Sequence, residues 1–203
     1  MNENKGEVKK FFKDIIIILL VVTALRACIV EPYKIPSGSM LNTLLIGDRV
    51  LATKFNYGLR FPFVKKSLFR FRDPKRGDIV VFSRPDEVST PNEDESKINI
   101  VKRAVGIPGD VIELKGSELF INGSKYDEPY AIYSNGGNVG NKKHFGPYTV
   151  PKDHVFLLGD NRDASRDSRF WEYNFLHMDL IKGKAMIIFY NFKKFTRTGK
   201  ILR

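Results

Sequence analysis

The sequence predicts a mainly β protein preceded by a single N-terminal transmembrane helix. Two observations in the 203-residue chain favour this fold class. One long apolar run lies close to the N-terminus, and short runs rich in Val, Ile, Leu and Phe follow it, bounded by turn residues. These β-type runs span residues 48–52, 78–83, 100–105, 111–114, 118–121, 155–158 and 184–192. Runs 111–114 and 118–121 form a hairpin pattern followed by an Asn122-Gly123 turn, and the Gly/Asn-rich residues 133–147 predict a loop.

The composition fits one globular domain with an anionic partner. Apolar residues make up 42% of the chain, and 34 basic against 23 acidic residues give a net charge of +11. Such a charge indicates nucleic acid or a lipid surface as the partner. The single cysteine, Cys28, excludes an intramolecular disulfide, and the histidines at 144, 154 and 177 show no metal-ligand spacing. We therefore expect no metal and no cofactor.

The N-terminus has the pattern of a membrane anchor. Lysines at 5, 9, 10 and 13 precede an apolar run over residues 15–25. A bilayer needs about 20 helical residues, and residues 11–30 are long enough if the charged side chains near their ends reach the interfaces. The lysines would keep the N-terminus in the cytoplasm and place the rest of the chain outside. The alternative is a cleaved signal peptide, although Arg26 does not fit the lipoprotein-like processing pattern at 25–28.

Residues 54–72 form a basic-aromatic segment with six basic residues, six aromatic residues and no acidic residue. Interleaved positive charges and rings bind either single-stranded nucleic acid or an anionic lipid interface. The segment follows the predicted anchor by only about 25 residues, which favours the lipid. We therefore predict anionic membrane lipids, and no nucleic acid, as partners.

Residues 35–40, Ile-Pro-Ser-Gly-Ser-Met, are a candidate nucleophile loop just beyond the apolar run. Pro36 stiffens the entry to the loop, and Gly38 allows a close approach of backbone or ligand. A serine beside a glycine can present its hydroxyl and its amide to one point, which suits a nucleophile with a neighbouring oxyanion site. The alternative is a polar loop that leaves a membrane segment.

The β-type run 100–105 carries two adjacent charges, Lys102 and Arg103, which face opposite sides because side chains alternate along a strand. If the strand is central, the lysine is partly buried. Burial lowers its pKa from about 10.4 towards the range near 7–8 that suits a general base. The alternative is an edge strand on which both charges are solvated. No histidine lies near either serine of the loop in the sequence, so lysine is the available base.

A third candidate segment of a functional site follows the apolar run 155–158. Residues 159–169 alternate acids, arginines and serines in the sequence GDNRDASRDSR. A strand that leads into so many opposite charges favours a hydrogen-bonded network around a site. A solvated loop is the alternative.

Four segments together resemble the bacterial type I signal peptidases, a family of membrane-bound serine proteases that remove signal peptides. The segments are EPYKIPSGSMLNTL at 31–44, GDRVLATKFNYGLR at 47–60, residues 76–82 joined to VKRAVGIPGD at 101–110, and GDNRDASRDSR at 159–169. Two positions depart from the family pattern, since Asn42 replaces a usual proline and Ala164 a usual asparagine. The Ser-x-x-Lys motif of penicillin-binding proteins and the Gly-x-Ser-x-Gly elbow of α/β-hydrolases are both absent.

The resemblance implies a Ser–Lys dyad. Ser39 would be the nucleophile and Lys102 the general base, with the Ser37 hydroxyl and the Ser39 amide as the oxyanion hole. Ser165 would hold Lys102 in position by a hydrogen bond. Charged residues would support the site through ion pairs, namely Arg103, Asp160, Arg162, Asp167 and Arg169.

The resemblance also implies a fold and a function. The family fold is mostly antiparallel β-sheet with a small β insertion, expected here over residues 112–151. Residues 1–30 would be the cytoplasmic N-terminus and transmembrane anchor, and residues 31–111 with 152–203 the catalytic β core. The protein would be a single-pass enzyme of the cytoplasmic (inner) membrane with its catalytic domain outside. It would cleave signal peptides from exported preproteins after small residues.

Two rival functions stand beside this one. A self-cleaving relative such as the repressor autoproteases would use the same dyad, but this chain has an anchor pattern and no DNA-binding helical domain. An inactive membrane-bound binding protein is the second rival, and the intact serine and lysine argue against it.

Overall fold

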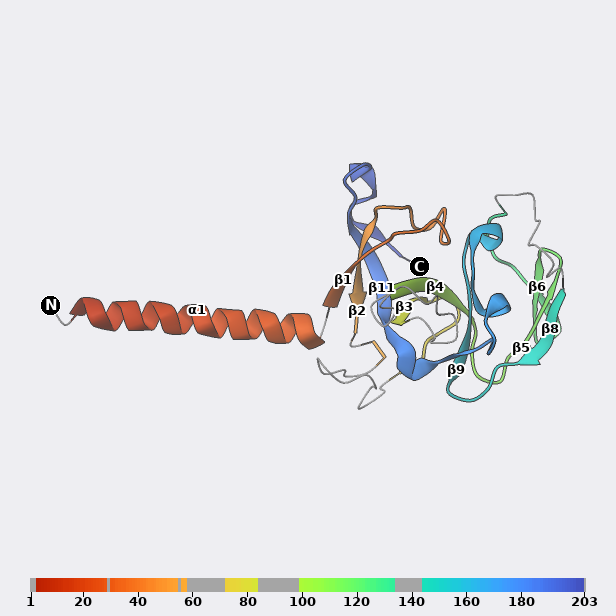
Figure 1. Ribbon diagram of the computed structural model, residues 1–203, viewed down its shortest axis with the longest axis horizontal. Coiled ribbons are helices and arrows are strands. Elements are labelled where there is room, and N and C mark those ends of the chain that lie inside the picture. The colour runs from red at the N-terminus through yellow and green to blue at the C-terminus, as the bar shows by residue number, and fades with distance from the viewer. Residues whose placement is uncertain are drawn as a thin grey trace.

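The computed structural model describes residues 3–28, 30–54, 56–57, 72–83, 99–133 and 144–202. One long helix, α1 (Glu3–Cys28), projects from a body of two β-sheets (Figure 1). Most of the basic-aromatic segment 54–72 lies outside the described residues, so its contact with lipid stays a prediction. Short 3-10 turns complete the described helices: η3 (Arg162–Ala164), η4 (Ser168–Phe170), η5 (Met178–Leu180) and η6 (Phe195–Arg197).

The predicted N-terminal helix is present, but the predicted membrane span is not found. In the described part of the chain, no helix combines the length and the apolar character needed to cross a bilayer. The physical reason is that Lys13 and Asp14 precede the apolar run at 15–25 and Arg26 follows it, so the uninterrupted apolar part of α1 is shorter than the about 20 residues that a bilayer needs.

An eight-stranded antiparallel sheet forms the larger part of the body. Its order is β1-β2-β11-β3-β4-β9-β10, and β12 pairs with β11. The strands are β1 (Val30–Lys34), β2 (Arg49–Thr53), β3 (Ile79–Ser83), β4 (Asn99–Gly106), β9 (His154–Leu158), β10 (Leu176–His177), β11 (Ile181–Tyr190) and β12 (Lys200–Ile201). The prediction of a mainly antiparallel β fold is therefore confirmed.

A second, four-stranded sheet has the order β7-β6-β5-β8 and lies at the far end of the body from α1 (Figure 1). Its strands are β5 (Val111–Lys115), β6 (Glu118–Ile121), β7 (Ser124–Tyr126) and β8 (His144–Thr149). The predicted β5–β6 hairpin is present, and Asn122 and Gly123 both take positive φ in the turn that follows. Asn-Gly favours this geometry because neither residue is strongly penalised at positive φ.

The loop predicted over residues 133–147 is wrong for residues 144–147, which belong to strand β8, and residues 134–143 lie outside the described part of the chain. The Gly146-Pro147 pair inside β8 argues against a strand in sequence, yet β8 lies at the edge of its sheet, where a proline is tolerated. A register shift in the β5–β8 pairing shows that β8 is also irregular.

The core lies on both faces of the large sheet. In β3, Ile79 and Val81 pack into one buried cluster, while Val80 and Phe82 pack into another on the opposite face. Strand β4 pairs with β3 on one side and with β9 on the other, so it is a central strand. The two charged side chains on β4, Lys102 and Arg103, are both buried.

Candidate active site

A buried serine–lysine pair forms the centre of the site. Lys102 Nζ donates a hydrogen bond to Ser39 Oγ over 2.5 Å. Lys102 is 3% exposed and Ser39 9% exposed, which confirms the prediction that the lysine is buried on a central strand. Burial lowers the pKa of Lys102 to about 8, against the opposing effect of Asp167 and Asp160.

Backbone hydrogen bonds hold the first residue of the nucleophile loop, Ile35, against Gly47 and Asp48. The Ile35 N–H donates to the Asp48 carbonyl, and the Gly47 N–H donates to the Ile35 carbonyl, each over 2.9 Å. The Asp48 carboxylate is fully buried and accepts hydrogen bonds from the Leu45 N–H and from the Arg197 guanidinium. Arg197 also donates to the Thr43 carbonyl, so the C-terminal segment holds the loop that carries Ser39.

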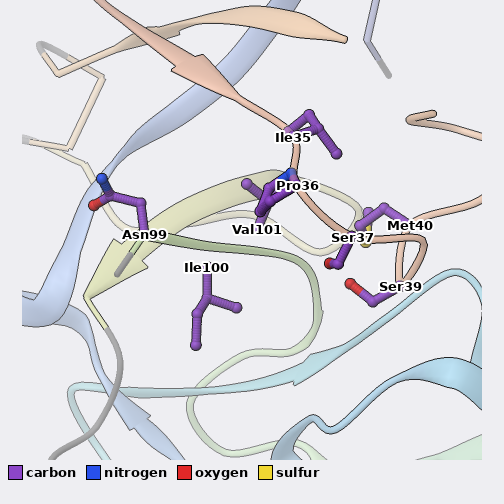
Figure 2. A pocket seen from close by; sticks show the side chains of 8 residues that line it. All are labelled: Ile35, Pro36, Ser37, Ser39, Met40, Asn99, Ile100 and Val101. Atoms are coloured by element: carbon purple, nitrogen blue, oxygen red, sulfur yellow. The ribbon is translucent and has the colours of Figure 1, made fainter. Parts of the chain in front are cut away.

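Two hydrogen-bond donors of the nucleophile loop, the Ser39 N–H and the Ser37 hydroxyl, have no partner among the described residues. Figure 2 shows the Ser37 and Ser39 hydroxyls pointing towards one another. Among the described residues, no acceptor takes the Ser39 N–H, and the exposed Ser37 hydroxyl has no hydrogen-bond partner. Both donors are therefore available to a bound group.

A small pocket of about 210 Å³ opens beside these donors, lined mainly by apolar surface (Figure 2). It lies between residues 35–40 of the loop and the first three residues of β4. The lining residues are Ile35, Pro36, Ser37, Ser39, Met40, Asn99, Ile100 and Val101.

The charged residues predicted around the site form three separate ion pairs. Arg103 makes a bidentate pair with Asp160, and its Nε and Nη2 lie 2.9 and 2.7 Å from the two carboxylate oxygens. Arg169 makes a second bidentate pair, with Asp167. Arg162 instead pairs with Glu128, a residue that the sequence analysis did not select. All of these arginines and aspartates are almost fully buried.

The predicted hydrogen bond between Ser165 and Lys102 is absent. Ser165 is 5% exposed, and its hydroxyl has no hydrogen-bond partner in the described structure. Its side chain lies instead against Gly159, where an added Cβ would stand 2.2 Å from Ser165 Oγ and 2.5 Å from the Ser39 carbonyl oxygen. Gly159 thus allows this close packing behind the nucleophile.

Sequence reasoning missed several residues that hold the site together. Asn161 donates to the carbonyls of Gly38 and Ser39, and Thr43 donates to Asp160 over 2.5 Å. The Tyr130 ring lies 3.9 Å from the Arg103 guanidinium. Asn161 and Thr43 fall inside two of the quoted segments, which was a signal for them. Tyr130 lies outside those segments and carried none.

The described residues offer no site for a metal. In these parts of the chain, no three His, Cys, Asp or Glu side chains come together in an arrangement that could hold an ion. A buried serine whose hydroxyl is held by a buried lysine is, in contrast, the arrangement of an activated nucleophile beside its base. Fold and site thus point to a serine hydrolase.

Comparison with known proteins identifies the family. The family model for the signal peptidases, peptidase S26, matches residues 8–190. A signal peptidase I of Pseudomonas fluorescens is 36% identical, over 85% of this chain and 65% of its own length. One of Pseudomonas aeruginosa is 35% identical, over 95% of this chain and 78% of its own length. A solved signal peptidase I of Enterococcus faecalis is 27% identical and covers 56% of this chain and 97% of its own, with a TM-score of 0.41.

The chain therefore belongs to the signal peptidase family, peptidase S26, and by class it is a serine peptidase.

Proposed function

We propose that the protein is a membrane-associated endopeptidase that removes signal peptides from exported preproteins, with Ser39 as nucleophile and Lys102 as general base. The observation that carries this proposal is the 2.5 Å contact between Lys102 Nζ and Ser39 Oγ in a buried setting. A pKa of about 8 leaves roughly a tenth of such lysines neutral at pH 7, against roughly one in 3000 at the ordinary value of 10.5. The burial therefore supplies a usable base.

The reaction follows from the positions of the donors. Neutral Lys102 takes the proton from Ser39 Oγ as that oxygen attacks the carbonyl carbon of the scissile peptide. The negative charge that develops on the carbonyl oxygen is stabilised by the Ser39 N–H and the Ser37 hydroxyl. Lys102 then gives its proton to the leaving amine, and water, activated by the same lysine, hydrolyses the acyl-enzyme.

The pocket beside Ser39 fits small side chains in the signal peptide. Its volume of about 210 Å³ and its apolar lining suit residues such as alanine close to the cleaved bond. β9 pairs with β4 only from Arg103 onwards, so among the described strands residues 99–102 of β4 have a neighbour on one side alone. An extended substrate can pair with this free edge and lie along the pocket.

Association with a membrane rests on α1. The helix projects away from the β body (Figure 1), and many of the large apolar side chains along it are exposed. These are Phe11, Phe12, Ile15, Ile16, Ile17, Ile18, Leu19, Val21 and Val22. Lipid is the medium that favours such a surface, and the preceding lysines place the N-terminus on the cytoplasmic side. Flotation of the full chain with liposomes tests this association, and a chain that stays unbound would contradict it.

Cleavage of a purified preprotein tests the proposal directly. We expect Ser39→Ala to abolish cleavage while the melting temperature stays close to that of the parent, because the change removes a single hydroxyl and keeps the backbone of the loop. Ser37→Ala should lower kcat by about 100- to 1000-fold with little change in KM, since it removes one oxyanion donor. Ser124→Ala, on the exposed strand β7, is the matched control and should cleave normally. Full activity of Ser39→Ala would rule out the proposed nucleophile.

A further inference from the structure

The direction of the Ser39 N–H depends on what holds the peptide bond between Gly38 and Ser39. A trans peptide unit is planar, so its C=O and its N–H point to opposite sides. The side chain that fixes the Gly38 carbonyl therefore also fixes the direction in which the Ser39 N–H points. This makes the partners of the Gly38 carbonyl important for an oxyanion hole.

Asn161 is the side chain that reaches this carbonyl. Its Nδ2 donates to the Gly38 carbonyl over 3.1 Å, and its backbone N–H donates to the Ser39 carbonyl, also over 3.1 Å. Asn161 thus binds the carbonyls on both sides of the Ser39 Cα. The Leu41 N–H also donates to the Gly38 carbonyl, over 3.2 Å, as part of the local turn.

Asn161 is itself firmly placed. It is 2% exposed and forms a bridge with Ile132, in which the Ile132 N–H donates to the Asp160 carbonyl over 2.7 Å. The Arg162 N–H in turn donates to the Ile132 carbonyl over 2.9 Å. Because segments on both sides anchor Asn161, its two donors form a rigid support behind the nucleophile.

We propose that Asn161 is a positioning residue that keeps the Ser39 N–H directed at the developing oxyanion. The inference rests on the proposed function, since it assigns a role within the same site. It differs from an ordinary packing role because the predicted effect falls on the transition state. Substrate binding in the ground state should change little.

The main test compares Asn161→Asp with the parent enzyme. The aspartate has nearly the same shape, but its carboxylate cannot donate to the Gly38 carbonyl. We expect kcat to fall by about 10- to 100-fold with KM nearly unchanged. This loss is smaller than the about 100- to 1000-fold loss for a removed donor, because the Leu41 N–H still holds the same carbonyl. A peptide aldehyde, which adds to Ser39 and places its oxygen in the hole, should bind more weakly by a similar factor.

Asn174→Asp is the matched control. Asn174 also donates its side-chain amide to backbone carbonyls, those of Ser168 and Trp171, and both of these residues lie outside the nucleophile loop. We expect this control to lose stability without losing kcat. In the double variant Asn161→Asp with Ser37→Ala, the loss should be smaller than the product of the single losses, because both act on one oxyanion.

An unchanged kcat, or a higher KM with unchanged kcat, would overturn the assignment. Equal losses of kcat in Asn161→Asp and Asn174→Asp would also overturn it. Should Asn161→Asp unfold, Asn161→Ala carries the test, because it places no charge beside the carbonyl. Ser39→Ala in the same assay separates the two ideas. If Ser39→Ala abolishes cleavage and Asn161→Asp does not slow it, only the role of Asn161 fails.

Discussion

Lys102 and Arg103 are neighbours on one strand, but their side chains have hydrogen-bond partners of different charge. Both are buried, at 3% and 2% exposed, on opposite faces of β4. Arg103 has a bidentate carboxylate, the Gly77 carbonyl and the Tyr130 ring as partners. Lys102 has a neutral hydroxyl, Ser39, as its hydrogen-bond partner. Burial with a full set of partners keeps a charge and fixes structure, whereas burial without a direct counter-charge lowers the pKa and creates a base.

The comparison predicts that the two faces of β4 contribute to stability with opposite sign. On the Lys102 side, removal of the charge should stabilise the protein and destroy its activity. On the Arg103 side, removal of the charge should destabilise the protein, because Asp160 would be left buried without a counter-charge. We therefore expect one face of β4, that of Lys102, to serve activity and the other, that of Arg103, to serve stability.

The largest expected effect is that of Lys102→Met, which should lower kcat/KM by at least about 1000-fold while raising the free energy of unfolding. The folded-state pKa of Lys102 lies near 8 and its ordinary value at 10.5, so the unfolded chain binds more protons between these values. Parent stability should therefore rise with pH through this window. The advantage of Lys102→Met should be about 3 kcal/mol at pH 7 and should disappear above pH 10.5.

Denaturant unfolding from pH 7 to pH 10.5 measures this effect. Lys115→Met, on the exposed surface of β5, is the control and should change neither activity nor stability appreciably. A Lys102→Met variant that is less stable than the parent at pH 7 would show that burial of the Lys102 ammonium group does not lower the free energy of unfolding.

The second effect in size is that of Arg103→Met, which should lower the free energy of unfolding by about 3 to 5 kcal/mol. The double variant Arg103→Met with Asp160→Asn should recover part of this loss, because the remaining side chain carries no charge. A double-mutant cycle in urea measures the coupling. If the single and double variants are equally stable, the Arg103–Asp160 pair is not the reason why this face of β4 tolerates a charge.

Features set by local pattern were predictable from the sequence. Apolar runs bounded by turn residues located β2, β3, β4, β9 and β11 of the large sheet, whereas β1 and the two-residue strands β10 and β12 were not predicted. The two adjacent charges on β4 drew attention to Lys102. The hairpin of β5 and β6 and the Asn-Gly turn after it were also predicted, whereas β7, which follows that turn, was not. The helix α1 was also predicted, but a helix long and apolar enough to span a bilayer is not found in the described part of the chain.

Features set by contacts between distant segments were not predictable. Arg197 binds Asp48, 149 positions away in the chain, and nothing in a basic C-terminal tail distinguishes that arginine from its neighbours. The hydroxyl of Ser165 lies against Gly159, and no pattern in sequence gives the direction of a serine side chain. The roles of Ser37 and the ion pairs, and the division into core and inserted subdomain, stay predictions.

The smallest expected effect is that of Asp167→Asn, which changes the electrostatic field at Lys102 and leaves the lysine itself in place. Asp167 is the first of the two carboxylates that raise the pKa of Lys102, and Arg169, its partner, lowers it. Asp167→Asn removes the negative charge and leaves Arg169 uncompensated, and both changes disfavour the charged lysine. In the parent, kcat/KM should rise with pH and level off above about 8, because the neutral lysine is the active form.

In Asp167→Asn this inflection should move to lower pH by about half a pH unit or more, so the variant gains relative activity on the acid side. Asp110→Asn is the matched control, because Asp110 is also a buried aspartate paired with an arginine, Arg76, and it is not among the charges that shift the pKa of Lys102. A pH profile of kcat/KM for the three proteins decides the point, with a melting curve to confirm that each is folded. An inflection that stays in place or moves to higher pH would mean that the titrating group is not Lys102. The difference between the two faces of β4 would then no longer account for the activity.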